Sequence, residues 1–546
     1  MKTPSHSSSP RFLLLTFLLA TLALWAQPTP VSLATLIQTG NRKAALEKIR
    51  AGADVNEAQP DGTRPVHWAV FRVDYELLDA LIAKKAKVDV TNDFGSTPLA
   101  EAVKLADARM VKTLLDAGAS HESPNEDGET ALMLAIKAGN LRLVDLLIKA
   151  GANVNVVEHF HNQTPLMYAA AASQNAGEMV KLLLSKDANP KPRALFSDWP
   201  NQLSSEPRGQ YRPVGGLTAM MYAARDGCSD CVDALLKAGV DINLPTPEGV
   251  TPLMLALDNE HNDVAKLLLD RGANPGVWDW WGRTALYIAV ERKEATAPGG
   301  GRGARAAAPA PARGAGPRVS SMEIINALLA ANVPVNPELN MHRPSRGGNS
   351  GRFSETQLST GCTPLYRAVQ SNDMEVIQAL LAKGANPNID TMGFTSFLVA
   401  AGVGGGGRGG ANLTVMDALL QHGADVNAQV TGTRTYSMRI SYHPPADREG
   451  ASALHEAAQS GRLDMVKFLL DKGANPGLLD ANGKKPVDLV GAGNAAGGAG
   501  GARGAGAPAA GGRGAGAGGA GGRGGGANPA DLVEIRTLLQ SAAVKK

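Results

Sequence analysis

Two cysteines in the sequence have the spacing of a redox pair. Cys228 and Cys231 form a C-x-x-C motif where a helix is expected to start, and a helix N-terminus stabilises a thiolate. However, no histidine follows Cys231, and the strand–helix pattern of thiol oxidoreductases does not surround the motif. The remaining interpretations are a local disulfide in an oxidising compartment, or two buried thiols, because Cys231 occupies an inward-facing position.

Other residue types that carry chemistry are scattered. His159 and His161 could begin a metal site, but two histidines without further ligands at a known spacing favour surface residues. The run GGGGRGG from 404 is not followed by the lysine that would reach a phosphate, and neither G-x-S-x-G nor H-E-x-x-H occurs. We therefore predict a non-enzymatic protein with no catalytic residue, metal or cofactor.

Aromatic residues are rare but concentrated. The stretch GVWDWWGRT from 276 holds Trp278, Trp280 and Trp281, which are half of the six tryptophans in the chain. Phe94 and Phe160 lie at comparable places in TNDFGST and VEHFHNQT. Tryptophan is enriched at interface hot spots, so one interpretation is a protein-binding ridge. The other is that these rings cover one another or pack under an insertion.

A repeated segment must position these residues. In EGVTPLMLALDNEHNDVAKLLLDRGANP from 248, Thr251 can cap a short helix and Pro252 suits its first position. A polar turn and a Leu-rich second helix follow, and Gly272 can end that helix in the left-handed conformation. Glycines after the second helix recur 33 residues apart at 118 and 151, and again at 239 and 272. Fixed-period repetition predicts a stack of helix pairs.

The segments resemble the ankyrin repeat, whose signature is T-P-L-H-x-A followed by a Leu-rich helix and G-A-D-V-N. The resemblance covers about residues 31–491 and 529–542. It rests on openings such as TPLMLAL (251), TPLMYAA (164) and SALHEAA (452), and on closings such as GADVN (52 and 423) and GANVN (151). The resemblance implies an all-α ankyrin-repeat solenoid of about eleven helix-turn-helix units with hairpin links, which binds proteins through a concave face of links and first helices.

The sequence departs from the family pattern at two kinds of position. The motif histidine, whose hydrogen bonds tie neighbouring repeats in the family, remains only as His67 and His455. The glycine that ends the second helix is replaced by Lys85, Asp187 and Asn332. Asp and Asn adopt the left-handed conformation more readily than Lys does.

Insertions interrupt the repeats at six places. Three are Gly/Ala/Arg tracts between the two helices of a unit, with arginines but no acidic residue, and we expect these tracts to be disordered. We predict a signal peptide at 1–26, repeats at 27–294 with a link insertion at 194–214, a disordered insertion at 295–320, repeats at 321–490 with insertions at 338–360, 403–411 and 430–448, a disordered insertion at 491–528, and a C-terminal capping helix at 529–546.

The N-terminus predicts export. Lys2 and Arg11 precede an apolar run over residues 12–26, which is too short to span a bilayer but typical of a signal peptide. Leu24 lies where a small residue is preferred, so an uncleaved anchor is the alternative and would be the one contact with a membrane. We expect a secreted bacterial protein, periplasmic or extracellular, that binds a protein partner as a monomer.

Two other functions stay open. The Gly-rich tracts could bind an anionic polymer or envelope component through their arginines. They hold no aromatic residue to stack on bases, and the net charge is only +3, which disfavours nucleic acid. The second alternative is a thiol-redox protein that uses Cys228 and Cys231.

Overall fold

The computed structural model describes residues 31–197, 214–295, 319–339, 361–403, 411–431, 448–492 and 528–545. The predicted signal peptide and the greater part of the six insertions lie outside the described residues. The chain divides into two compact units, with unit 1 ending at Ala194 and unit 2 beginning at Leu195. Among the described residues, no helix is both long and apolar enough to cross a membrane.

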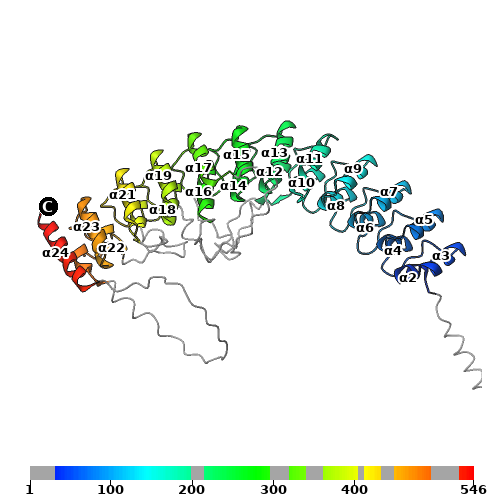
Figure 1. Cartoon of the computed structure of the whole chain (residues 1–546), viewed down its shortest axis with the longest axis horizontal. Helices are drawn as coiled ribbons and strands as arrows, with labels where there is room; N and C mark the ends of the chain where they lie inside the picture. Colours follow the sequence, from blue (N-terminus) through cyan, green and yellow to red (C-terminus); the bar gives the residue numbers. More distant parts are fainter. Residues whose placement is uncertain are drawn as a thin grey trace, which may run out of the picture. The chain divides into compact units, whose positions relative to one another are not determined.

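Unit 1 consists of helix pairs that follow one another in sequence order (Figure 1). Each first helix packs on the first helix of the next pair and on its own second helix. The first helices are α2 (Leu33–Gln38), α4 (Pro65–Phe71), α6 (Pro98–Lys104), α8 (Ala131–Lys137) and α10 (Pro165–Ala171). The second helices are α3 (Arg42–Arg50), α5 (Tyr75–Ala83), α7 (Ala108–Asp116), α9 (Leu141–Lys149) and α11 (Ala176–Leu184).

Unit 2 has the same organisation, and a short antiparallel pair, β1 (Phe196–Ser197) with β2 (Val214–Gly215), precedes its helices. Its first helices are α12 (Ala219–Arg225), α14 (Pro252–Asp258), α16 (Ala285–Ala295), α18 (Pro364–Ser371), α20 (Ser396–Ala400) and α22 (Ala453–Gln459), and the 3-10 helix η3 (Pro486–Leu489) takes the last such place. The second helices are α13 (Ser229–Lys237), α15 (Asn262–Asp270), α17 (Ser321–Ala330), α19 (Met374–Ala382), α21 (Leu413–Gln421), α23 (Leu463–Asp471) and α24 (Pro529–Lys545). The prediction of an all-α repeat fold is confirmed.

The repeat unit forms as its sequence predicts. The Thr97 hydroxyl accepts the backbone N–H of Ala100 at 3.1 Å, and Pro98 occupies the first position of α6. Asp107 caps α7 by accepting the N–H of Met110 at 2.9 Å. Gly118 then ends α7 with a φ of 92°, a conformation that glycine adopts without steric penalty.

The core of each unit lies between the two layers of helices. Helix α6 packs on α7, and Leu99 and Val103 of α6 and Met110 and Leu114 of α7 are all buried. Burial of a side chain of this size contributes about 1.5–3 kcal/mol. Ala102, which is also buried, is small enough to let the neighbouring first helix approach.

The helix ends that lack glycine keep the same backbone path. Lys85, Asp187 and Asn332 have φ values of 62°, 61° and 53°. The left-handed turn is therefore retained at these positions, including at Lys85, whose side chain favours it least.

Candidate functional site: the row of link tips

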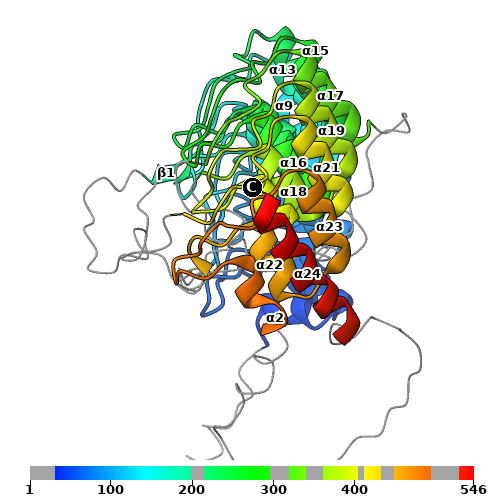
Figure 2. The same ribbon diagram turned by 90° about the vertical axis from the view of Figure 1, so that its left-hand side faces the viewer.

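The segments that join one helix pair to the next, here called links, lie on one side of the helices. In unit 2 the links, with β1 among them, lie to the left of the helices in Figure 2. In several of the described links, a polar side chain holds the tip in a tight turn. Asn92 Oδ1 accepts the backbone N–H groups of Phe94 at 3.1 Å and Ser96 at 2.9 Å. The carboxylate of Glu158 likewise accepts the backbone N–H groups of Phe160 and His161, at 2.7 Å each.

Consecutive tips are tied to one another by backbone hydrogen bonds. In unit 1 the N–H of Asp93 donates to the carbonyl of Asp61 at 2.9 Å. In unit 2 the N–H of Trp280 donates to the carbonyl of Glu248 at 2.7 Å. These bonds join neighbouring tips, so that a side chain at one tip lies beside the next tip.

Asparagines of the G-A-D-V-N closings brace the base of the links. Asn155 Oδ1 accepts the N–H of Asn189 at 2.7 Å, and its amide donates to the carbonyl of Asp187 at 3.1 Å. Asn388 makes the equivalent pair of bonds with Asp425 and Gly423. Each closing asparagine thus joins its own repeat to the next, which the closing motif alone did not predict.

His67 and His455 tie neighbouring repeats, as the resemblance implied. His67 Nδ1 accepts the N–H of Arg64 at 3.1 Å, so Nε2 carries the proton and donates to the carbonyl of Ser96 at 3.1 Å. His455 has the same arrangement with Ser452 and the carbonyl of Lys484. Burial lowers the pKa of both histidines, because the neutral ring is the form that fits.

Because both histidines are buried as neutral rings, we expect the protein to lose stability in mild acid. A free histidine titrates near about pH 6.5, so the unfolded chain binds protons that the folded chain excludes. The free energy of unfolding should therefore fall as the pH drops from about 7.5 to about 5. Urea unfolding of the His67→Gln, His455→Gln double variant across this range is the measurement. The prediction would be contradicted if the free energy of unfolding of the variant fell with pH as steeply as that of the parent. Some pH dependence should remain in both proteins, because burial also lowers the pKa of His261.

The tryptophan stretch occupies the tip between α15 and α16. Trp278 is 69% exposed and Trp280 is 40% exposed, and Trp278 forms a β-bridge with Thr284 at the base of the tip. Trp281 does not fit the prediction of an exposed ridge, because its side chain is only 4% exposed. Its backbone N–H donates to Asp279 Oδ1 at 3.0 Å, as the backbone N–H of Phe94 does to Asn92, so the two tips share one turn although only the phenylalanine ring is exposed. Two of the three tryptophans therefore remain as surface candidates.

A buried charge network supports this tip. Arg283 Nε donates to Asp279 at 2.7 Å, and its NH1 group donates to Asp258 at 3.2 Å. Arg292 adds a second cation on Asp258 at 2.7 Å. Although burial alone would lower it, the carboxylates of Asp258 and Asp279 raise the pKa of Arg283. This network was not predicted from the sequence, where its one signal is an arginine just before a helix-capping threonine, at a position that Ser96 and Val250 occupy in other repeats.

The phenylalanine candidates lie in unit 1. Phe94 is 66% exposed at its tip and Phe160 is 58% exposed at another. The structure thus places Trp278 and Trp280 together on one tip of unit 2, and the two phenylalanines on separate tips of unit 1.

Comparison with known families identifies the repeat. A family model described as "Ankyrin repeats (3 copies)" matches residues 33–125, 106–194, 201–279, 220–297 and 320–430. A model described as "Ankyrin repeat" matches residues 449–481. The chain belongs to the ankyrin repeat family.

Parts of the chain are similar to curated proteins of different kinds. The chain is 27% identical over 238 residues to the B-cell lymphoma 3 protein homolog of Mus musculus, covering 43% of this chain and 39% of that protein. It is 30% identical over 176 residues to the mitochondrial disaggregase of Homo sapiens, covering 32% and 23%. It is 29% identical over 138 residues to alpha-latrocrustotoxin-Lt1a of Latrodectus tredecimguttatus, covering 25% and 8%. The chain therefore spans between 8% and 39% of the length of these relatives.

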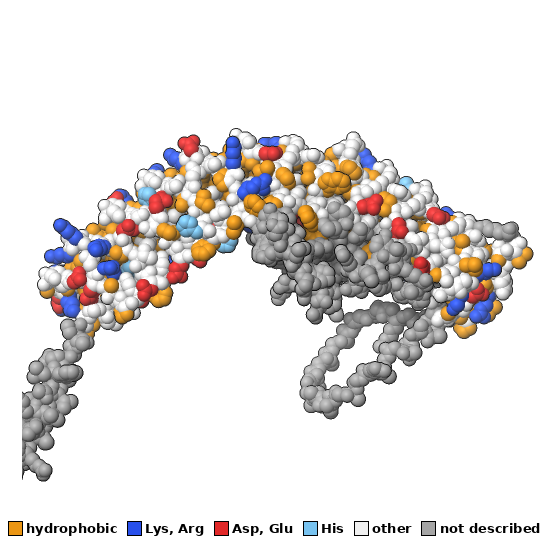
Figure 3. Space-filling model, turned by 180° about the vertical axis from the view of Figure 1, so that it is seen from behind, with side chains coloured by type: hydrophobic (Ala, Val, Ile, Leu, Met, Phe, Trp, Pro, Cys, Tyr) orange, Lys and Arg blue, Asp and Glu red, His pale blue; other side chains and the backbone are white. Residues whose placement is uncertain are grey.

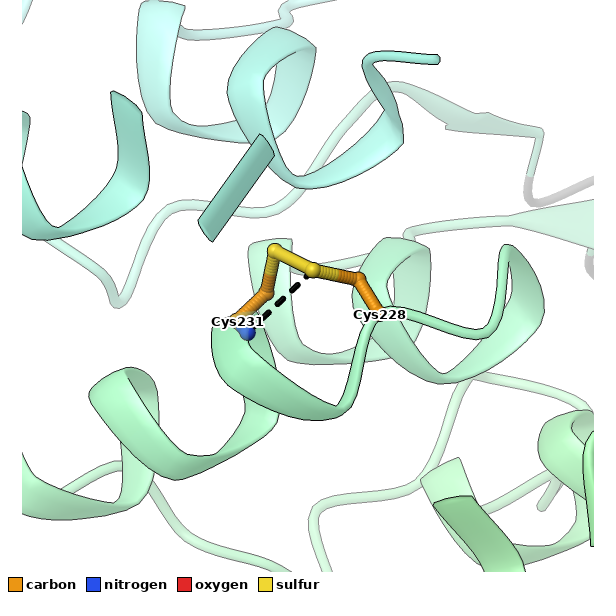
Figure 4. Close-up of a disulfide and its surroundings, with 2 residues drawn as sticks. All are labelled: Cys228 and Cys231. Carbon is orange, nitrogen blue, oxygen red and sulfur yellow. Dashed lines mark hydrogen bonds between the residues drawn. A yellow bond between two sulfur atoms is a disulfide. The ribbon is translucent and has the colours of Figure 1, made fainter. Parts of the chain in front are cut away.

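The C-x-x-C pair departs from the other ankyrin repeats of the chain. Cys228 and Cys231 are joined by a disulfide, and both side chains are buried (Figure 4). Cys228 stands at the cap of α13, where Asp74 and Asp107 stand in other repeats, and its sulfur accepts the N–H of Cys231 at 3.2 Å. The disulfide thus links the cap of a second helix to its first turn.

The histidine pair of the Phe160 tip does not assemble a metal site. His159 and His161 are exposed, and His161 Nδ1 lies 3.6 Å from Glu158 Oε1. Within the described ranges, no group of three or more His, Cys, Asp or Glu side chains is placed to hold a metal ion. Glu158 instead serves the turn of this ankyrin link through its backbone hydrogen bonds.

Proposed function

We propose that this chain is an exported, non-enzymatic scaffold that binds a partner protein, as a monomer, through its link tips and first helices. Ankyrin repeats mediate protein–protein interaction, and membership of the family supports that part of the proposal. The observation that carries it is the pair Trp278 and Trp280, exposed on a tip that a buried ion network supports. A rigid, exposed aromatic pair is typical of a binding hot spot.

Two features support export. The basic start and the apolar run over residues 12–26 are typical of a signal peptide. The disulfide between Cys228 and Cys231 suits an oxidising compartment. Burial of both cysteines disfavours the redox alternative, because disulfide exchange requires access to a sulfur. The arginines of the polymer-binding alternative lie outside the described residues.

The test replaces the exposed pair with alanine. We expect the Trp278→Ala, Trp280→Ala double variant to bind its partner roughly tenfold or more weakly, since truncation of a hot spot removes about 2 kcal/mol. The immobilised chain is used as bait in an extracytoplasmic extract of the producing cells, and recovery of each captured protein is compared between parent and variant.

The matched control is Val533→Ala. Val533 is 63% exposed on the second helix α24, away from the links and the first helices, so its loss removes exposed apolar surface without touching the proposed face. Both variants should keep the helical circular dichroism of the parent. Equal recovery with the double variant and the parent, or equal loss with the control, would reject the proposed face.

A further inference from the structure

The two exposed phenylalanines of unit 1 lie on one connected row of tips. A Cβ added at Gly62 would lie 3.3 Å from Cα of Asn92, so these tips touch. A Cβ added at Gly95 would lie 2.7 Å from the backbone nitrogen of Glu126, and one at Gly128 would lie 3.1 Å from that of His159. Phe94 and Phe160 are therefore separated by a single intervening tip, with no insertion between them.

Carboxylates lie along the same row of tips. Asp93 shares its tip with Phe94, Asp61 lies on the preceding tip, and Glu126 and Asp127 lie on the tip between the two phenylalanines. Among the described residues none of these four carboxylates forms an ion pair. Asp61 accepts the backbone N–H of Thr63 at 3.0 Å. Other carboxylates of these links also take part in internal contacts: Glu57 with the backbone of Ala34, Glu122 with that of Asn153, Glu129 with Lys137, and Glu158 with the backbone of Phe160. Figure 3 shows acidic and hydrophobic side chains next to one another on unit 1, to the left of the central grey residues.

We call Asp61, Asp93, Phe94, Glu126, Asp127 and Phe160 the acidic ridge, and we propose that it binds a positively charged segment of a partner protein that also carries apolar side chains. This inference rests on the proposed function and adds the chemistry of one partner. The exposed rings offer apolar area, and the free carboxylates select against anionic surfaces and for arginine or lysine. An arginine can in addition stack on a phenylalanine ring.

The chain itself contains competing cationic segments, its Gly/Ala/Arg tracts. The longest, over residues 493–527, holds Arg503, Arg513 and Arg523 and no acidic residue. However, it consists otherwise of Gly, Ala, Pro and Asn, so it lacks the large apolar side chains that would cover Phe94 and Phe160. The charge of this tract is therefore opposite to that of the ridge, but the tract has no large apolar side chain that would cover the two phenylalanine rings.

The experiment titrates the full chain with a short fluorescein-labelled peptide in which arginine alternates with leucine. We expect binding that weakens with added salt, and a dissociation constant roughly tenfold higher for the Asp93→Asn, Glu126→Gln, Asp127→Asn variant. The Phe94→Ser, Phe160→Ser variant should raise the dissociation constant of the peptide by a similar factor. The same peptide with serine in place of leucine should bind the parent more weakly.

The control variant removes the same charge elsewhere. Glu47→Gln, Asp79→Asn, Glu178→Gln changes three exposed carboxylates on the second helices α3, α5 and α11. An equal loss with this variant would mean that net charge alone attracts the peptide, and the ridge proposal would fail. It would also fail if deletion of 493–527 raised the affinity tenfold, because the chain's own arginines would then occupy the ridge. Either result leaves the tryptophan-dependent capture of the proposed function intact.

Discussion

Replacement of Arg283 with alanine is expected to destabilise unit 2 by about 3–5 kcal/mol. The substitution leaves Asp279 fully buried with a carboxylate that no cation faces, and it removes one of the two cations on Asp258. An unpaired buried charge costs far more than the pair contributes when intact. Urea unfolding followed by far-UV circular dichroism should show a lower midpoint for the variant.

A control and a rescue make this result specific. Arg271 pairs with Asp233 at 2.7 Å, where the two side chains are 44% and 34% exposed, so Arg271→Ala should cost less than about 1 kcal/mol. In the Arg283→Met, Asp279→Asn double variant, the asparagine can still accept the N–H of Trp281, as Asn92 does for Phe94 in its own link. This variant should recover most of the loss. A single Arg283→Ala variant as stable as the control would refute the role of the network.

The second large effect is expected at Gly393. Its φ is 91°, and a Cβ added there would overlap the carbonyl oxygen of Thr431, which is backbone and cannot swing away. Gly393→Ala should therefore cost about 3 kcal/mol, from the left-handed backbone and the forced shift of the next link together. Chemical denaturation is again the measurement.

Gly423 provides the matched comparison for Gly393. Its φ is 86°, and nothing lies within 4 Å of the position that a Cβ would take. Gly423→Ala should therefore show only the backbone penalty, about 1–2 kcal/mol. If the two substitutions were equally destabilising, contact between neighbouring tips would contribute nothing to the stability of the stack.

The repeat architecture could be predicted because it depends on local chemistry. A Thr-Pro pair followed by an apolar run, such as Thr97 and Pro98, starts a helix. A residue in the left-handed conformation, such as Asp187, ends one. The inter-repeat bonds of His67 could likewise be predicted, from the family resemblance. In each case the decisive partners lie within a few residues or in the same position of the next repeat.

The site was less predictable because it depends on which way individual side chains turn. Trp280 and Trp281 are adjacent and of the same type, yet one is exposed and the other buried. Asp279 holds the turn in which both tryptophans lie, and Arg283, which bonds to Asp279, also bonds to Asp258 in the preceding repeat. A sequence pattern of one repeat contains no information on that longer-range pairing.

The backbone bond from Trp280 to Glu248 has a consequence for affinity. A loop that fluctuates in the free protein must be ordered when a ligand arrives, and the entropy lost is subtracted from the contact energy. The Trp280 side chain lies on a turn that is already fixed by the backbone bond to Glu248 in the neighbouring tip. The loss of loop entropy therefore occurs during folding and is not subtracted again when a ligand binds. Such preorganisation allows a small contact area to bind with a slow dissociation rate.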